Sequence, residues 1–193
     1  ASTSRVDQRN LGFVTIDGKT ARDFDDAVFA KSNGDGSWQV YVAIADVAHY
    51  VRPGSAIDQE AYLRGTSVYF PTHAIPMLPE NLSNNLCSLK PDVNRFTLTC
   101  EMLIDSTGWV QSYRIYESVI RSRARLVYDD VAEFLDTGQT RTIRNKEILD
   151  NLIVMNEVAK VLQEKRTKRG AINFNFAEQQ IELDDQNQMV GVS

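Results

Sequence analysis

The most chemically informative feature of the chain is a group of four aspartates within ten residues. These residues are Asp17, Asp23, Asp25 and Asp26. Carboxylates that converge away from water repel one another strongly, so a fold that gathers them must protonate some, expose them to solvent or place cations between them. The flanking residues 13–16 and 27–30 are apolar runs typical of buried strands. An acidic loop held between two core strands is therefore a candidate metal site.

The spacing of the acids favours a small divalent cation. An extended backbone would point Asp23 and Asp25 to one side and Asp26 to the other. Asp17 would then reach in across the intervening loop. Mg²⁺ and Mn²⁺ bind a few carboxylates and keep several water molecules, which suits such a set of oxygen ligands. Two ions roughly 3.5–4 Å apart can stabilise the attacking and leaving oxygens of a phosphoryl transfer, so this chemistry is the one the acids suit best.

Other metal chemistries fit the residues less well. A calcium-binding EF-hand loop that began at Asp23 would need a polar ligand and a glycine where the chain has Ala27 and Val28. Zinc is disfavoured because the chain has two histidines and two cysteines without the spacing of a zinc site. A phosphatase-type Asp-x-Asp nucleophile is a weaker alternative, since Asp23 follows a polar stretch. Acids that only decorate a loop and cap its turns are a further alternative.

Composition limits the classes of function. The chain has 193 residues, about one ordinary domain, and a net charge of −5, so it cannot hold a phosphate backbone through bulk charge. Cys87 and Cys100 are expected to be reduced core thiols. The longest apolar run, residues 40–45, is far too short to cross a bilayer, and no secretory signal opens the chain. We therefore expect a cytoplasmic protein with no membrane partner.

The elements that must position the acids predict an α+β fold, mostly an antiparallel sheet with an acidic active-site loop and helices packed on it. Asn-Gly-Asp-Gly at residues 33–36 is a strong hairpin signal between two predicted strands. The predicted strands are residues 13–16, 27–32, 38–45, 68–70, 98–104, 110–121, 172–176 and 181–183, with another beginning at the C-terminus. The predicted helices are residues 57–65, 128–135 and 144–168, and residues 71–79 are expected to be an irregular loop. In the last helix, Ile148, Leu152, Met155, Ala159 and Leu162 form an apolar stripe at helical spacing.

Several ordered motifs surround the acids. They are Thr-Ile-Asp-Gly at 15–18, Ala-Arg-Asp-Phe-Asp-Asp-Ala at 21–27, Val-Ala-Ile-Ala-Asp-Val at 42–47, Arg-Gly-Thr-Ser-Val-Tyr-Phe-Pro at 64–71 and Leu-Ser-Asn-Asn-Leu-Cys-Ser-Leu at 82–89. In order and spacing these motifs resemble the ribonuclease II/R (RNB) family of exoribonucleases, and they are closer to its ribonuclease R branch. The resemblance covers most of the chain.

The resemblance implies processive, hydrolytic 3′→5′ degradation of single-stranded RNA to nucleoside 5′-monophosphates with Mg²⁺, for which Mn²⁺ is a possible substitute. It also implies that residues 1–193 are the N-terminal portion of an RNB catalytic domain. The C-terminal half of that domain and the flanking cold-shock and S1 domains, which would be partners of this part in the parent protein, are not recognisable here. This fragment would carry the metal carboxylates without the completed site, and by itself it could be inactive.

Motif positions assign roles to individual residues through the same resemblance. Asp17, Asp23 and Asp26 would hold the metal ions. Asp25 would be the acid on which the chemical step depends most, and all four acids would be catalytic. Tyr69 would stack on the 3′-terminal base, a contact that contributes about 1–3 kcal/mol and ignores sequence. The alternative from a different class is a non-catalytic RNA-binding or interaction module that keeps the fold.

Three secondary features have two interpretations each. Arg121, Arg123 and Arg125 alternate, so they could form a basic row along a phosphate backbone or be ordinary surface charges of a strand. Asp46 could support the metal site or only end its strand. Arg64 could contact RNA or pair with the acidic loop or a nearby acid such as Glu60.

Overall fold

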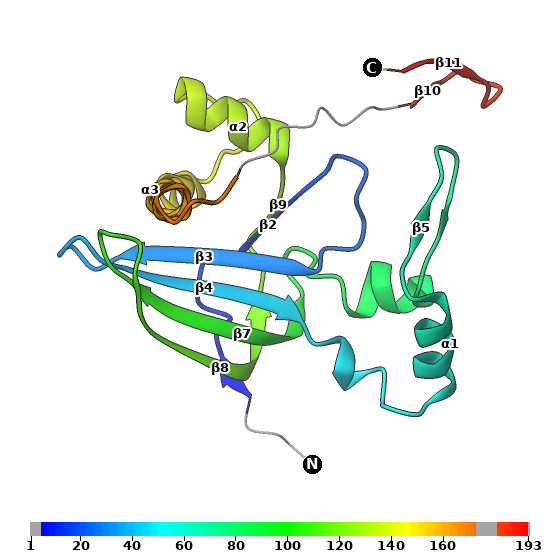
Figure 1. The fold of residues 1–193 in the computed structure, drawn as a ribbon, viewed down its shortest axis with the longest axis horizontal. Coiled ribbons are helices and arrows are strands. Elements are labelled where there is room, and N and C mark those ends of the chain that lie inside the picture. Colours follow the sequence, from blue (N-terminus) through cyan, green and yellow to red (C-terminus); the bar gives the residue numbers. More distant parts are fainter. Residues whose placement is uncertain (1–4, 173–180, 193) are drawn as a thin grey trace.

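A seven-stranded sheet forms the centre of the protein, with strand order β1-β8-β7-β4-β3-β2-β9 (Figure 1). The structure is a computed structural model that describes residues 5–172 and 181–192. The strands are β1 (Val6–Asp7), β2 (Val14–Asp17), β3 (Asp26–Ser32), β4 (Trp38–Ala45), β7 (Asn94–Ile104), β8 (Val110–Arg121) and β9 (Ala124–Val127). Strands β3, β4, β7 and β8 are antiparallel neighbours, whereas β1 pairs with β8 and β2 pairs with β9 in parallel. The predicted α+β fold with a mostly antiparallel sheet is confirmed.

The hairpin between β3 and β4 forms where the glycines predict it. Gly34 and Gly36 have φ angles of 81° and 83°, which residues with a side chain rarely adopt. The amide of Asn33 donates to the carbonyl of Ser37 at 2.9 Å and closes the turn. This turn fixes the register in which Asp26 lies opposite Ile44 at the far end of the hairpin.

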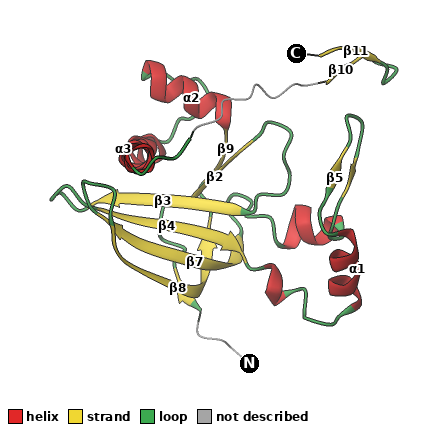
Figure 2. Ribbon diagram, in the orientation of Figure 1, coloured by secondary structure: helices red, strands yellow, loops and turns green. Residues whose placement is uncertain are grey.

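The helices lie outside the sheet (Figure 2). They are α1 (Ala56–Arg64), α2 (Tyr128–Thr137) and α3 (Lys146–Lys168), together with the short helical turns η1 (Val47–His49) and η2 (Leu82–Leu86). Two small hairpins complete the described residues: β5 (Val68–Tyr69) with β6 (Ala74–Ile75), and β10 (Ile181–Leu183) with β11 (Met189–Val192). None of the helices in the described part of the chain combines the length and the apolar content needed to span a bilayer.

Several element predictions need correction. Residues 71–79 are not wholly irregular, because β6 folds back on β5 and pairs Val68 with Ile75. Strand β8 has the predicted bounds, Val110–Arg121, but the sequence did not predict β9, which follows after a turn and pairs with β2. The predicted strand at 172–176 lies outside the described residues except for Ile172, to which no strand is assigned.

Two hydrophobic layers cover the two faces of the sheet. On one face Phe13, Tyr41 and Leu89 pack in a buried cluster that also contains Phe24 from the acidic loop. On the other face α2 and α3 cover β2, β9 and the ends of β3, β4 and β7, with Leu152 nearly inaccessible to solvent. The predicted apolar stripe of α3 holds at its start but not at its end. There Leu162 is exposed, and Val161 packs on the sheet beside Val158.

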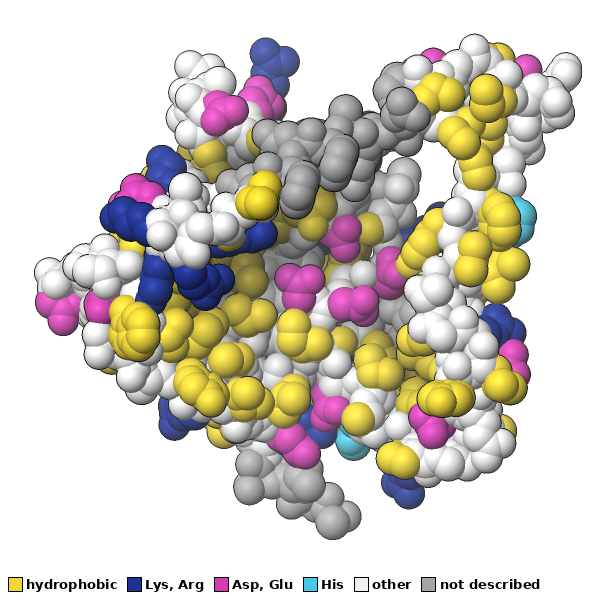
Figure 3. Space-filling view, viewed as in Figure 1, with side chains coloured by type: hydrophobic (Ala, Val, Ile, Leu, Met, Phe, Trp, Pro, Cys, Tyr) yellow, Lys and Arg dark blue, Asp and Glu magenta, His cyan; other side chains and the backbone are white. Residues whose placement is uncertain are grey.

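Helix α3 leaves part of its face of the sheet open. Ile44, Leu98, Tyr113 and Ile115 project from β4, β7 and β8 on this side and are exposed. Figure 3 shows apolar side chains spread over the sheet beside the helix. Cys100 is half-buried on this face and Cys87 is buried in the opposite cluster, and both cysteines are free.

Candidate active site

Strands β2 and β3 place the four aspartates at one end of the sheet. Asp17 is the last residue of β2 and Asp26 is the first residue of β3, and the two strands pair at Val14 and Val28. Asp23 and Asp25 lie in the connection between them. Figure 3 shows acidic side chains in the hollow between the sheet and the part of the molecule that contains α1 and β5. Asp17 and Asp23 are half-buried, and Asp25 and Asp26 are exposed.

Phe24 anchors the acidic loop to the core. Its side chain is 8% exposed and packs in the cluster with Leu89. The Phe24 amide donates to the Ser88 hydroxyl at 3.1 Å, and the Leu89 amide donates to the Phe24 carbonyl at 2.9 Å. The Ala45 amide donates to the Asp25 carbonyl at 2.8 Å and joins the loop to the end of β4. The backbone of this part of the loop is therefore fixed on both sides.

The acids lie close enough to affect one another electrostatically. Partial burial raises the pKa of Asp25, and the negative charges of Asp23, Asp26 and Asp17 raise it further. Partial burial and the charge of Asp17 also raise the pKa of Asp26, although a hydrogen bond to its own backbone opposes the shift. The loop therefore brings the four predicted residues into one field of negative charge, which a cation would relieve.

The side chains as they stand do not form a finished set of metal ligands. Among the described residues, no three acidic, histidine or cysteine side chains converge closely enough to hold an ion. Asp17 accepts a hydrogen bond from the Gly18 amide at 2.6 Å. Carboxylate oxygens in a crowded, partly desolvated site fit the chemistry of Mg²⁺. Side-chain rotation would be needed to bring three of them onto one ion.

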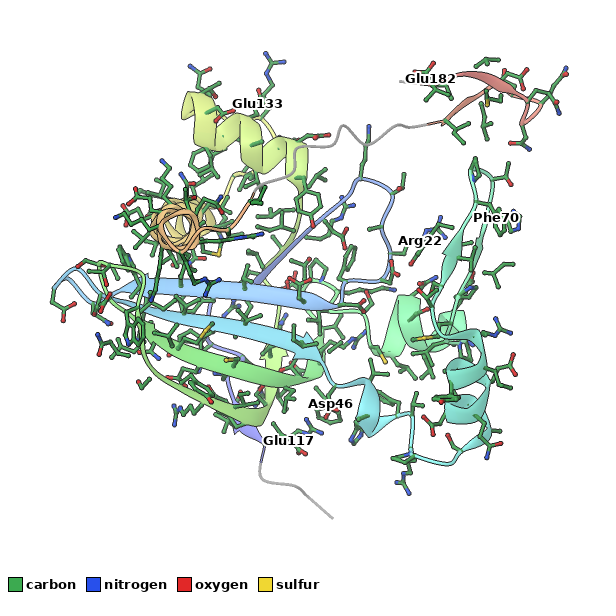
Figure 4. The ribbon with its side chains drawn as sticks, viewed as in Figure 1. Arg22, Asp46, Phe70, Glu117, Glu133 and Glu182 are labelled. Carbon is green, nitrogen blue, oxygen red and sulfur yellow. The ribbon has the colours of Figure 1, made fainter. Side chains whose placement is uncertain are left out.

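Tyr69 lies beside the acidic loop on the β5–β6 hairpin. Its hydroxyl is 3.4 Å from Oδ2 of Asp23, at the long end of the range for a hydrogen bond. The side chain is 70% exposed, so its ring is accessible to a base. Figure 4 shows Phe70 on the same hairpin and the Arg22 side chain on the acidic loop, on the side that faces the hairpin. The stacking role of Tyr69 stays a prediction, and its position next to a candidate metal ligand is compatible with it.

The three alternating arginines bind different parts of the protein. Arg121 pairs with Asp92 at 3.5 Å. Arg123 donates to the Arg9 carbonyl at 3.2 Å. Because the chain turns between β8 and β9, these residues do not continue along one strand, and of the two interpretations the basic row is not formed.

Arg125 holds the loop that follows Asp17. Its guanidinium donates to the carbonyls of Gly18 at 2.5 Å and Lys19 at 2.8 Å, and it lies 5.6 Å from the centre of the Phe24 ring. The alternating arginines made Arg125 a candidate in the sequence, but the pattern does not predict its contacts with Gly18 and Lys19. Arg125 therefore supports the loop between Asp17 and Asp23 from outside.

Asp46 follows the last residue of β4 and caps the turn that comes after it. Its carboxylate accepts from Arg5 at 2.5 Å and from the His49 amide at 3.1 Å, so it caps η1. Figure 4 shows Asp46 and Glu117 at the same end of the sheet, where Arg5 contacts both. The contacts of Asp46 are therefore those of a residue that ends its strand.

Arg64 makes the ion pair anticipated for it. Its Nε donates to Glu60 at 2.9 Å one helical turn away, and its Nη1 donates to the Pro76 carbonyl at 2.8 Å. The second contact joins α1 to the segment after the β5–β6 hairpin.

Comparison with known proteins identifies the family. Residues 5–193 match the RNB domain. Ribonuclease R of Vibrio parahaemolyticus is 51% identical over 178 residues, which are 92% of this chain and 21% of the relative. The structure of Mycoplasma genitalium RNase R in complex with ribose-methylated single-stranded RNA is similar with a TM-score of 0.92 and 35% identity, over 98% of this chain and 29% of that one.

The fold alone does not fix the activity. Yeast Ssd1, described as a pseudonuclease, is similar with a TM-score of 0.72 and 24% identity, over 86% of this chain and 20% of that protein. The chain spans about a fifth of the length of the Vibrio relative. The match along residues 5–193 and the identity to ribonuclease R nevertheless agree, and the chain belongs to the RNB family.

Proposed function

We propose that the gene product that contains this chain is a hydrolytic exoribonuclease that degrades single-stranded RNA processively from its 3′ end and releases nucleoside 5′-monophosphates. The observation that carries the proposal is the gathering of Asp17, Asp23, Asp25 and Asp26 in one loop of an RNB-family chain. Partial burial and the negative charges of Asp23, Asp26 and Asp17 raise the pKa of Asp25, as expected of a site built for cations.

Asp17, Asp23 and Asp26 would hold Mg²⁺, or Mn²⁺ in its place. When bound, the metal would stabilise negative charge at the phosphodiester and favour attack by water. Asp25 lies among the proposed ligands, where its carboxylate can orient the attacking water or accept its proton. Tyr69 would stack on the terminal base and keep the last phosphodiester beside Asp23, to which its hydroxyl points.

RNA is the proposed partner, and other parts of the protein would complete the site. The net charge of −5 leaves little to hold a phosphate backbone, and Arg121, Arg123 and Arg125 are engaged with the protein itself. We propose that residues 1–193 are the N-terminal portion of an RNB catalytic domain. The remaining half of that domain and flanking cold-shock and S1 domains would supply the basic path for RNA.

The test is a single-stranded RNA labelled at its 5′ end, incubated with the full-length gene product and Mg²⁺. Stepwise shortening from the 3′ end supports the proposal, and a chelator should stop it. Asp25→Asn should abolish shortening while RNA binding survives, because the substitution removes one charge and hardly changes side-chain size. Retained turnover in this variant would reject the role of Asp25. Loss of only a terminal phosphate would indicate a phosphatase.

A non-catalytic RNA-binding module is the second candidate. The structural similarity to a protein described as a pseudonuclease favours it, because that protein shares the fold. The clustered acids argue against it, since four adjacent carboxylates destabilise a loop that needs no cation. Tight RNA binding without shortening in the same assay would support the module.

A further inference from the structure

We propose that Ser88 is a positioning residue for the acidic loop, because its buried side chain fixes the backbone on both sides of Asp23. The inference rests on the proposed function, since it concerns the residues that would bind metal. Ser88 is the second residue after η2 and lies 64 residues from Phe24 along the chain. Its hydroxyl contacts the loop backbone, so Ser88 would act on the site through the loop.

The Ser88 hydroxyl makes two hydrogen bonds to the loop. It accepts from the Phe24 amide at 3.1 Å and donates to the Arg22 carbonyl at 2.8 Å. These two backbone groups belong to the residues on either side of Asp23. Ser88 is fully buried, so water does not compete for either bond. The Ser88 hydroxyl therefore fixes the direction of the backbone at Asp23, a candidate metal ligand.

The backbone around Ser88 is itself held in place. The Leu89 amide donates to the Phe24 carbonyl at 2.9 Å, so a backbone hydrogen bond also joins the two segments. Arg95 donates from Nε to the Ser88 carbonyl at 2.8 Å and from Nη2 to the Asn85 carbonyl at 3.0 Å. Residues from η2 to β7 thus form a support for the loop.

Loss of the hydroxyl would change the loop more than the core. Phe24 would still fill its place beside Leu89, but its amide and the Arg22 carbonyl would lose their partner in a buried setting. A buried polar group without a partner is unfavourable, so the segment must shift or admit water. Asp23 and Asp25 flank Phe24, and they would no longer be held in fixed relation to Asp17 and Asp26.

The experiment compares Ser88→Ala with Ser118→Ala. Ser118 is also fully buried, and its hydroxyl lies 2.7 Å from that of Thr97 and 2.6 Å from that of Thr99, within the sheet. Both variants lose buried hydrogen bonds, but only Ser88 contacts the acidic loop. Two readouts apply to each protein without RNA: the affinity for Mn²⁺ by calorimetric titration, and the hydrogen-exchange rate of the Phe24 amide.

Ser88→Ala should bind Mn²⁺ about tenfold more weakly, roughly the effect of one lost hydrogen bond, and the Phe24 amide should exchange at least about tenfold faster. Ser118→Ala should change neither. Equal Mn²⁺ affinities for Ser88→Ala and the wild type would overturn the inference while the proposed function stands. A wild-type protein that neither binds Mn²⁺ nor shortens RNA would overturn both.

Arg95→Gln is the second variant should Ser88→Ala fail to fold. Glutamine cannot reach both carbonyls that the guanidinium of Arg95 contacts, so the support for Ser88 should loosen without a change to the buried hydroxyl. We expect a smaller loss of Mn²⁺ affinity, about threefold, and faster exchange at Phe24. Wild-type values for both readouts would overturn the inference.

Discussion

Neutralising Asp25 should stabilise the metal-free chain. Burial and the charges of three neighbouring aspartates raise the pKa of Asp25, so its ionised form is less favourable in the folded state than in the unfolded state. Asparagine has nearly the same size and no charge, so Asp25→Asn removes the repulsion and keeps the packing. A residue proposed to be essential for turnover is thus expected to reduce stability.

The size of the effect follows from the exposure of the side chain and the number of its neighbours. Asp25 is exposed, so solvent screens each interaction to a few tenths of a kcal/mol. Three like charges and partial desolvation then sum to about 1 kcal/mol. For a chain of 193 residues this corresponds to a rise in Tm of about 2–4 °C.

Thermal unfolding followed by circular dichroism, at pH 7 with a chelator, measures this difference. Asp35→Asn is the control. Hydrogen bonds from Ser37 lower the pKa of Asp35, so removing this charge should not raise the Tm. Saturating Mg²⁺ should narrow the difference in Tm between Asp25→Asn and the wild type, because a bound cation offsets the repulsion among the aspartates. An Asp25→Asn protein that melts below the wild type in the chelator would refute the reasoning.

Three further perturbations test other parts of the structure. Phe13→Ala should lower the free energy of unfolding by about 3–5 kcal/mol in urea titrations, because the side chain is fully buried; a loss below 1 kcal/mol would contradict its place in the core. Burial would raise the pKa of Glu101, but hydrogen bonds from Tyr116 and Arg114 outweigh this effect and lower the pKa below 4.5. The ionised Glu101 carboxylate therefore stabilises the fold above that pH, and its contribution is lost as the pH falls. Glu101→Gln should therefore cost about 1–3 kcal/mol at pH 7 and less at pH 3, and a cost independent of pH would contradict this. Tyr69→Phe should retain most RNA affinity in fluorescence titrations while Tyr69→Ala loses about 1–3 kcal/mol, and equal losses would argue against stacking.

Local signals in the sequence predicted much of the fold. The Asn-Gly-Asp-Gly turn predicted the β3–β4 hairpin, and the apolar run before Asp17 predicted β2. Helix α3 begins and ends within two residues of its predicted bounds, because apolar spacing and the following Gly170 are local features. The exposure of Leu162 was not predictable in the same way. Which side of a long helix stays covered depends on where the sheet beneath it ends.

Contacts between distant segments could not be read from the sequence. Ser88 lies in a motif that marks the family, but nothing local shows that its hydroxyl faces the backbone of Arg22 and Phe24. The pairing of β2 with β9 likewise depends on a turn after β8 that no glycine or proline signals. For the site, the sequence predicted which acids come together but not their side-chain orientations, which the contacts of Asp17 and Asp23 determine.

The most direct test of the central claim is a calorimetric titration of Mn²⁺ into the wild-type chain and into a variant with Asp17→Asn and Asp26→Asn. The account predicts saturable binding by the wild type and its loss in the variant, since two of the three proposed ligands lose their charge. Equal affinity and stoichiometry in both proteins would show that the cation binds elsewhere and would contradict the claim.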